Sequence, residues 1–304
     1  MTVADLVETG LMRRDVSLGP MTTYRFGGPA AWFAEPGTQA AFFDVVAAAR
    51  ELHLPIVMLG RGSNVVISDQ GLEAVVVRLA GSFLTVHVEN DGTVIAGAAT
   101  PLARVARASV EANRGGLEFL IGIPGSVGGA VRMNAGCLGS ETADWLIDCT
   151  IADLHTQMVR TATPVDLAMG YRSSLVRDRD AVLSARFHTE AQPASAGKAR
   201  IREVTQWRRQ SQPGGTLNAG SVFKNPPDDA AGRVIDHLGL KGLSVGGVRV
   251  SPRHANFFEA GDGATAHDVY SLVHEVRRRV IAATGIDLEP EIKFLGRFEV
   301  GGGE

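Results

Sequence analysis

The stretch GGLEFLIGIPGSVGGAVRMNAGCLG, residues 115–139, governs the interpretation of the whole chain because it is rich in glycine yet apolar between the glycines. A flexible linker would be polar, whereas Leu120, Ile123 and Val131 must be buried and therefore require a fixed backbone course. Glycines with positive φ can turn amide groups toward a common point, as in a phosphate-binding nest. The stretch predicts either a cradle for a nucleotide cofactor or a tight glycine corner between two sheets. The four glycines expected to take positive φ are Gly122, Gly125, Gly128 and Gly129.

A second glycine loop, GRGSN at residues 60–64, separates a predicted buried strand over 55–60 from another over 65–68. Because this loop runs into a strand and not into a helix, it argues against a Rossmann dinucleotide fold. It favours a strand–loop–strand phosphate clamp in which Ser63 and Asn64 add side-chain hydrogen bonds. The alternative is a simple β-hairpin turn.

Composition limits the possible functions. The 304 residues suffice for two or three domains, and the net charge of −3 comes from interspersed charges of both signs. There is no basic field for nucleic acid and no polybasic run for a membrane surface. Asp5 and Glu8 lie where a secretory signal would have its apolar core, and no apolar run approaches a membrane span. We expect a cytoplasmic protein without nucleic-acid, membrane or obligate protein partners.

No metal site is expected, because the histidines are scattered and the two cysteines form no ligand pair with metal spacing. Cys137 and Cys149 are interpreted as small buried side chains.

Helices are expected where apolar residues recur at helical spacing, and strands where they alternate or form short runs. The predicted helices run from an N-cap at Thr38 to 53, from an N-cap at Thr100 to 115, over a basic segment ending at 210, and from Thr265 to 284. In the last of these, Thr265 and Asp268 are expected to form a capping box, and Gly285 is expected to end the helix. Further strands are predicted at 31–34, 74–79, 83–89, 93–98, 147–154, 181–188 and along 285–300, and a polar linker at 190–199.

Three polar side chains are candidates for chemistry. Arg172 in GYRSS offers a fork of donors suited to a carboxylate, although it could be a surface arginine. Ser221 in AGSVFKN fits a proton donor better than a nucleophile, because no Ser-His-Asp order or G-x-S-x-G elbow is present; a turn serine is the alternative. Glu291 lies in the last predicted strand, where spacing alone does not distinguish it from Glu289, and either could be a solvated carboxylate.

Taken together, the ordered motifs of this chain resemble the UDP-N-acetylenolpyruvoylglucosamine reductase family of bacterial peptidoglycan synthesis, over nearly the whole length. The resemblance is carried by GRGSNVVISDQG (60–71), IGIPGSVGGAVRMNAG (121–136), GYRSS (170–174), NAGSVFKNP (218–226), AGRVIDHLGLKG (231–242), SPRHANF (251–257) and LEPEIKFLG (288–296). It implies an α+β protein with a two-domain FAD-binding fold of the vanillyl-alcohol-oxidase type and a C-terminal α+β substrate domain. The implied domains are 1–78 and 79–195 for FAD, the second completed by 286–304, and 196–285 for the substrate.

The resemblance also implies an oxidoreductase reaction. NADPH reduces non-covalently bound FAD, and the hydride then passes to the enolpyruvyl carbon of a UDP-sugar to give UDP-N-acetylmuramate for the cell wall, on which cell shape and division depend. Ser221 would protonate the carbon next to the carboxylate, while Arg172 and Glu291 would stabilise the enolic intermediate. Implied FAD contacts are Tyr24, Gly60, Arg61, Gly62, Ser63, Asn64, Gly122, Ile123, Pro124, Gly125, Ser126, Gly128, Gly129, Asn134 and Gly136. Implied substrate contacts are Tyr171, Lys224, Asn225, Arg233 and His254.

Two departures from the family pattern are visible. Ser211 lies where the family often has a lysine near the substrate, so the candidates to replace that lysine are Arg208, Arg209 and Arg233. The chain also lacks the inserted tyrosine-bearing loop of longer members and resembles the shorter type. The alternatives to the reductase are another sugar or lactone flavin oxidase of the same superfamily and an inactive sensor that binds flavin or a UDP-sugar.

Overall fold

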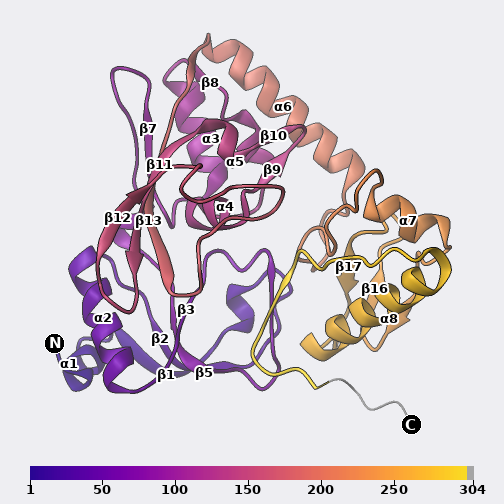
Figure 1. The fold of residues 1–304 in the computed structure, drawn as a ribbon, viewed down its shortest axis with the longest axis horizontal. Coiled ribbons are helices and arrows are strands. Elements are labelled where there is room, and N and C mark those ends of the chain that lie inside the picture. Colours follow the sequence, from indigo (N-terminus) through magenta and orange to yellow (C-terminus); the bar gives the residue numbers. More distant parts are fainter. Residues whose placement is uncertain (300–304) are drawn as a thin grey trace. The chain divides into compact units, whose positions relative to one another are not determined.

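The computed structural model describes residues 1–299, and its internal contacts divide the chain into two compact units (Figure 1). Unit 1 contains Met1–Arg14, Trp32–Arg61 and Ala74–Arg208. Unit 2 contains Asp15–Ala31, Gly62–Glu73 and the described chain from Arg209 onward. Both units mix helices and strands, in agreement with the predicted α+β class. The finer three-domain division stays a prediction.

A five-stranded antiparallel sheet with the order β12-β11-β13-β7-β6 forms the main sheet of unit 1. Its strands are β6 (Val86–Val88), β7 (Val94–Gly97), β11 (Leu146–Asp153), β12 (Val159–Ala162) and β13 (Asp180–Phe187). Alternation along β11 and β13 buries Cys149, Ile151 and Ala185 completely. Two small antiparallel pairs lie in the same unit: β8 (Arg114–Gly115) with β14 (Glu190–Ala191), and β9 (Gly136–Cys137) with β10 (Ser140–Glu141).

A four-stranded sheet has the order β1-β2-β5-β3. Its strands are β1 (Met12–Ser17), β2 (Pro29–Ala34), β3 (Ile56–Met58) and β5 (Leu72–Val77). Strand β3 pairs in parallel with β5 and is half-buried, so the expectation of a fully buried strand here was wrong. Helix α2 (Gln39–Glu51) starts as predicted, because the Thr38 hydroxyl accepts a hydrogen bond from the Ala41 amide at 3.2 Å.

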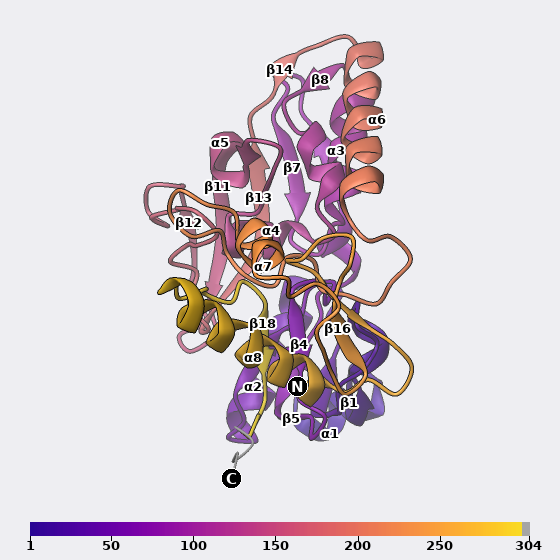
Figure 2. The same cartoon turned by 90° about the vertical axis from the view of Figure 1, so that its right-hand side faces the viewer.

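The other helices of unit 1 pack around these sheets. They are α1 (Val3–Glu8), α3 (Leu102–Glu111), α4 (Val127–Met133), α5 (Thr142–Trp145) and α6 (Ala194–Ser211), with 3₁₀ turns η2 (Gly81–Leu84) and η3 (Glu118–Gly122). Helix α6 runs beside α3 (Figure 2), and Gly197 of α6 lies so close that an added Cβ would be 2.6 Å from the Val110 side chain. The predicted linker at 190–199 is therefore wrong: its polar, small residues form a strand and a helix start, and the small size of Gly197 permits helix packing.

Unit 2 is built on one long helix. Helix α8 (Ala266–Thr284) packs its apolar face, including Val269, Leu272 and Val276, into a buried cluster with Phe223 and Phe258 (Figure 1). The remaining elements are the antiparallel strands β15 (Ser244–Val245), β16 (Val248–Val250) and β17 (Phe258–Ala260), the parallel pair β4 (Val65–Ile67) and β18 (Lys293–Leu295), helix α7 (Ala231–His237) and the turn η1 (Gly19–Met21).

Two further element predictions were wrong. Thr100 does not cap α3, because its hydroxyl donates to the Thr85 carbonyl at 2.9 Å, and Pro101 takes the N-cap position. The helix then ends before Asn113, which has a φ of 59°. The tail is extended, but only Lys293–Leu295 form a strand, since pairing with β4 is limited to three residues. Residue 300 of that prediction lies outside the described chain.

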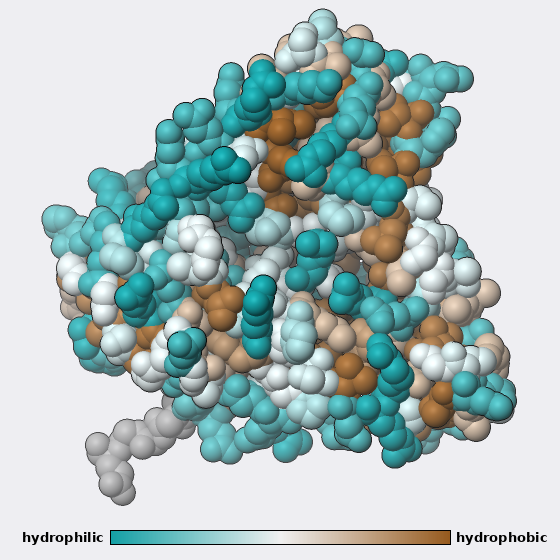
Figure 3. Space-filling model, turned by 180° about the vertical axis from the view of Figure 1, so that it is seen from behind, coloured by the Kyte–Doolittle hydropathy of each residue, from teal (hydrophilic) through white to brown (hydrophobic). Residues whose placement is uncertain are grey.

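On the face drawn in Figure 3, hydrophobic residues form small patches separated by hydrophilic side chains. Within residues 1–299, no helix is both long enough and apolar enough to cross a membrane.

The start of α8 provides a stability test. The Thr265 hydroxyl accepts from the Asp268 amide at 3.1 Å, and the Asp268 carboxylate accepts from the Thr265 amide at 3.0 Å, which is the predicted capping box. Replacing Thr265 by alanine should lower the opening free energy of α8 by about 1 kcal/mol. Native-state hydrogen exchange of the α8 amides measures that free energy. Thr265→Ser keeps the hydroxyl and should leave it nearly unchanged; equal losses in both variants would contradict the capping role.

Candidate active site

The glycine stretch 115–139 folds into η3 and α4 joined by a short loop. None of the four glycines predicted to take positive φ does so; positive values occur at Gly116 (106°), Asn134 (42°) and Gly139 (82°). The predicted nest is therefore wrong. The amide of Gly128 is used inside the protein, where it donates to the Ala98 carbonyl at 2.8 Å.

Two of these glycines serve close packing instead. A Cβ on Gly122 would lie 2.8 Å from the Cys137 sulfur, and one on Gly128 would lie 3.2 Å from the Ala98 Cβ. This part of the stretch is thus a packed corner. The sequence pattern was ambiguous because both a cradle and a corner require backbone without side chains.

The two predicted glycine loops nevertheless meet. Gly60 lies next to the loop before α4, so that a Cβ on Gly60 would be 2.9 Å from the Ser126 hydroxyl. Gly60, Pro124 and Gly129 are exposed, whereas Ser126 is 4% exposed. A surface this poor in long side chains lets a flat or anionic group approach the main chain, and it therefore fits the diphosphate or ring system of FAD.

The 60–64 loop is not a hairpin turn, because β3 and β4 belong to different sheets. Its Gly62 has a φ of 64°, and a Cβ there would be 2.2 Å from the Met21 carbonyl oxygen. The Gly62 carbonyl accepts from the Thr23 amide at 3.0 Å. Asn64 donates from its amide to the Glu291 carbonyl at 3.1 Å, so its side chain supports the strand of a predicted catalytic residue.

Two of the residues predicted as FAD contacts have buried side chains that form hydrogen bonds within the protein. Tyr24 is 1% exposed, and its hydroxyl donates to the Phe258 carbonyl at 3.0 Å. Burial also raises the pKa of the Tyr24 phenol. Asn134 is completely buried; its side-chain amide donates to the Gly170 carbonyl and accepts from the Ala143 amide, each at 2.9 Å.

Asn134 instead holds the turn that carries Arg172. Gly170 and Ser173 exchange two backbone hydrogen bonds of 3.1 Å, and between them Arg172 has a φ of 50°. A non-glycine residue in the left-handed region is strained and persists only when its surroundings fix it. The guanidinium donates to the Gly136 carbonyl at 3.0 Å and lies 5.1 Å from the centre of the Tyr171 ring. The structure therefore brings Arg172 to the end of the glycine stretch.

Ser221 and Glu291 lie on neighbouring extended segments of unit 2. The Glu291 amide donates to the Val222 carbonyl at 2.8 Å, and Phe223 forms a β-bridge with Pro290. Glu289 is exposed and pairs with Lys224 at 2.7 Å, whereas Glu291 is half-buried. The pairing thus distinguishes the two glutamates: Glu291 lies opposite Val222, the residue after Ser221, whereas Glu289 lies opposite Lys224.

The predicted substrate residues of unit 2 have varied surroundings. The Asn225 side-chain oxygen accepts from the Ala231 amide at 3.0 Å, at the start of α7. Arg233 is exposed and pairs with Asp229 at 2.7 Å. His254 is half-buried; its Nδ1 accepts from the Asn256 amide at 3.2 Å, and its ring lies edge-on to Phe257. Prediction from sequence did not identify Asn256, a buried residue of the SPRHANF motif. No local spacing distinguishes it from its neighbours.

The cysteines differ from each other. Cys149 is fully buried as expected, and burial raises the pKa of its thiol to about 12. Cys137 is only half-buried, so the prediction of a buried side chain was wrong there. Burial raises the pKa of the Cys137 thiol, against the opposing effect of Arg208. Among residues 1–299, no cluster of three or more potential metal-ligating side chains occurs.

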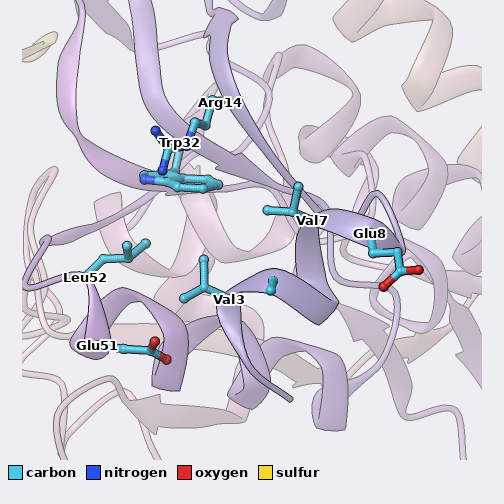
Figure 4. A pocket seen from close by; sticks show the side chains of 8 residues that line it. Val3, Val7, Glu8, Arg14, Trp32, Glu51 and Leu52 are labelled. Carbon is cyan, nitrogen blue, oxygen red and sulfur yellow. The ribbon is translucent and has the colours of Figure 1, made fainter.

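One open pocket of about 670 Å³ lies elsewhere in unit 1 (Figure 4). It is lined by Val3, Ala4, Val7, Glu8, Arg14, Trp32, Glu51 and Leu52. The Arg14 guanidinium lies 4.4 Å from the Trp32 ring centre, which is a cation–π contact. No residue predicted for the active site lines this pocket, so the pocket is separate from the candidate active site.

Comparison with known proteins gives matches over both parts of the chain. Residues 30–162 match the family profile described as FAD binding domain, and residues 212–295 match UDP-N-acetylenolpyruvoylglucosamine reductase, C-terminal domain. Proteins named UDP-N-acetylenolpyruvoylglucosamine reductase from Erythrobacter litoralis (strain HTCC2594) and Caulobacter sp. (strain K31) are each 40% identical to this chain. The alignments cover 95% of this chain in both cases, and 88% and 96% of the relatives, respectively.

A solved structure agrees with these matches. The crystal structure of UDP-N-acetylenolpyruvylglucosamine reductase from Thermus caldophilus is similar with a TM-score of 0.80 at 36% identity, and the match covers 94% of this chain and 100% of that chain. The predicted fold class, an FAD-binding fold followed by a C-terminal substrate domain, is confirmed.

The half-buried His254 imidazole in the candidate substrate region gives a pH test. Burial, the largest effect, lowers the pKa of His254 below its ordinary value. The unfolded chain therefore takes up the proton first, so the contribution of neutral His254 to stability is present above pH about 6.5 and is lost as the pH falls toward the folded pKa. The unfolding free energy of the wild type minus that of His254→Asn should rise with pH across this window.

This difference isolates His254 because His274, whose pKa is also lowered by burial, is present in both proteins. Denaturant unfolding at several pH values measures it, and NMR titration of the His254 ring gives the pKa directly. A difference that falls as the pH rises would contradict the assignment.

Proposed function

The chain belongs to the UDP-N-acetylenolpyruvoylglucosamine reductase family, and from this premise we propose a function and a role for each candidate residue. The protein is an FAD-dependent oxidoreductase that uses NADPH to reduce UDP-N-acetylenolpyruvoylglucosamine to UDP-N-acetylmuramate in peptidoglycan precursor synthesis. The observation that carries the site assignment is the backbone hydrogen bond between Val222 and Glu291, which joins the extended segments that contain Ser221 and Glu291. The expected cytoplasmic location and the expected absence of macromolecular partners stay predictions.

When bound, FAD supplies hydride transfer from NADPH to the enolpyruvyl group of the substrate. Gly60, Gly129 and the loop around Ser126 would hold it, because their exposed main chain allows close approach. The other predicted FAD contacts, among them Arg61, Ser63 and Ile123, stay part of the proposal. Ser63 occurs in the first loop and offers no imidazole for a covalent flavin link.

Ser221 is proposed as the proton donor. Hydride addition to the outer carbon of the enol ether leaves an electron pair on the carbon next to the carboxylate, and that carbon must take up a proton. The Ser221 hydroxyl gives its proton to this carbon and regains one from solvent. Gly220, with a φ of 77° and nothing within 4 Å of an added Cβ, precedes Ser221. A positioned general acid contributes about 100- to 10,000-fold.

Arg172 is proposed to bind the substrate carboxylate, onto which the negative charge of the enolic intermediate spreads. Its guanidinium is permanently charged and presents parallel donors that match a carboxylate. One donor already bonds the Gly136 carbonyl, which fixes the plane of the group. Lysine would supply the charge but not the fixed fork of donors.

Glu291 is proposed to stabilise the intermediate through a proton or hydrogen bond beside Ser221. Lys224, whose side chain is 15% exposed and paired with Glu289, is proposed as a substrate contact, together with Tyr171, Asn225, Arg233 and His254.

Ser211 lies in the last turn of α6, where the family often has a lysine. Arg208, Arg209 and Arg233 remain the candidates for that lysine's contact.

Substitution of the proton donor tests the proposal. For Ser221→Ala, we expect NADPH to bleach the flavin at the normal rate, whereas the substrate restores its colour about 100- to 10,000-fold more slowly, because only the second half-reaction needs the proton. Stopped-flow absorbance with one substrate at a time separates the two steps. Wild-type protein that takes up no FAD would refute the whole proposal, and an unchanged rate of recolouring would remove Ser221 as donor.

The alternatives have different outcomes in the same experiment. A sugar oxidase would turn over with oxygen and a free sugar. A sensor would be bleached by NADPH, but the enolpyruvyl substrate would never restore its colour.

A further inference from the structure

A buried asparagine supports the segment that carries Ser221. We propose that Asn256 is a positioning residue, which fixes the Ser221 hydroxyl beside Glu291 for proton transfer. This inference deepens the proposed function and rests on it.

The Asn256 side chain binds the segment in the manner of a neighbouring strand. Its Oδ1 accepts from the Phe223 amide at 2.9 Å, and its Nδ2 donates to the Phe223 carbonyl at 2.8 Å. The Asn256 carbonyl accepts in turn from the Val222 amide at 2.8 Å. One residue, 3% exposed, therefore satisfies three main-chain groups of the two residues that follow Ser221.

The opposite edge of the segment is bound to the glutamate strand. The Val222 carbonyl accepts from the Glu291 amide at 2.8 Å, and the Lys224 amide donates to the Glu289 carbonyl at 2.9 Å. The Glu291 carbonyl is bonded on its far side by Asn64. The segment after Ser221 is thus held from both edges, by Asn256 and by the strand of Glu291.

On the N-terminal side of Ser221, the Gly220 amide donates to the Asn218 side-chain oxygen at 3.0 Å, while Gly220 has a positive φ and open space where a Cβ would lie. On the C-terminal side, Ser221 is positioned through Val222 and Phe223, and its own β-bridge to Phe257 lies next to Asn256. Loss of the Asn256 amide would leave the buried Phe223 groups unpaired and release this anchor.

The chemistry of the contact requires an amide. Asparagine offers one acceptor and one donor, which match the amide and carbonyl groups of Phe223. Aspartate has nearly the same shape, but its second oxygen would face the Phe223 carbonyl, so one attraction becomes a repulsion. Asn256→Asp is thus a change of hydrogen bonding at nearly constant volume, and Asn256→Ala removes both bonds.

Stopped-flow measurements on the FAD-loaded protein test the proposal. In both Asn256 variants we expect bleaching by NADPH at the wild-type rate and recolouring by saturating substrate that is slowed by about 100-fold, as for a misplaced catalytic group. Thr265→Ala, which removes a helix cap in the same unit, is the matched control and should leave both rates unchanged. Equal slowing of both half-reactions in either Asn256 variant would show a merely structural role and overturn the proposal.

Two further measurements distinguish a positioning role of Asn256 from a general loss of structure in the variants. In the Ser221→Ala background, Asn256→Asp should cause no additional slowing of recolouring, because the group that it positions is absent. Additive slowing would overturn the proposal. Hydrogen exchange of the Phe223 amide, which needs no turnover, should accelerate in Asn256→Ala; protection equal to the wild type would also overturn it.

The experiment separates this inference from the function on which it rests. If wild-type protein is never recoloured by the enolpyruvyl substrate, the proposed function fails. If the wild type is recoloured and Ser221→Ala slows that step, while the Asn256 variants recolour normally, the function stands and only the positioning role is lost. If Asn256→Ala does not fold, the Asn256→Asp rates decide the outcome.

Discussion

The backbone pairing between residues 222–224 and the segment around Pro290 is the interaction on which the candidate site of unit 2 depends. It brings together two parts of the chain that are nearly 70 residues apart in sequence, with hydrogen bonds of 2.8 Å from Glu291 to Val222 and 2.9 Å from Lys224 to Glu289. Main-chain bonds fix register, and because Glu289 and Glu291 lie two residues apart, a shift by two residues would bring Glu289 to the position of Glu291. The half-buried carboxyl group and the exposed, lysine-paired one are thus distinguished by pairing.

A similar principle operates in unit 1, where a buried asparagine side chain replaces a strand partner. Asn134 ends α4 in the left-handed conformation and bonds the Gly170 carbonyl, next to the strained turn of Arg172. Tyr171 and Ser173 of this turn are exposed. In both units, then, a fully engaged amide holds the loop of a proposed catalytic side chain, and buried polar groups of this kind are costly to lose.

Prediction from sequence succeeded where local signals suffice. The N-cap at Thr38, the capping box at Thr265 and the stop at Gly285 depend only on neighbouring residues, and all three are present. It was wrong where a polar or small residue had a distant partner. Thr100 looked like a cap but bonds Thr85. The small residues around Gly197 looked like a linker, but they allow α6 to pack on Val110.

The sequence by itself determined the fold class, the two glycine loops and the set of candidate side chains, because the order of the motifs and the local periodicity can be observed directly in the sequence. It also indicated that residues 115–139 must follow a fixed, buried path. Only the tertiary structure decided that Gly122 and Gly128 serve packing, that Tyr24 and Asn134 are buried, and that Glu291 pairs with the residue after Ser221. These outcomes depend on contacts between residues far apart in sequence, and such contacts leave no periodic or local signal.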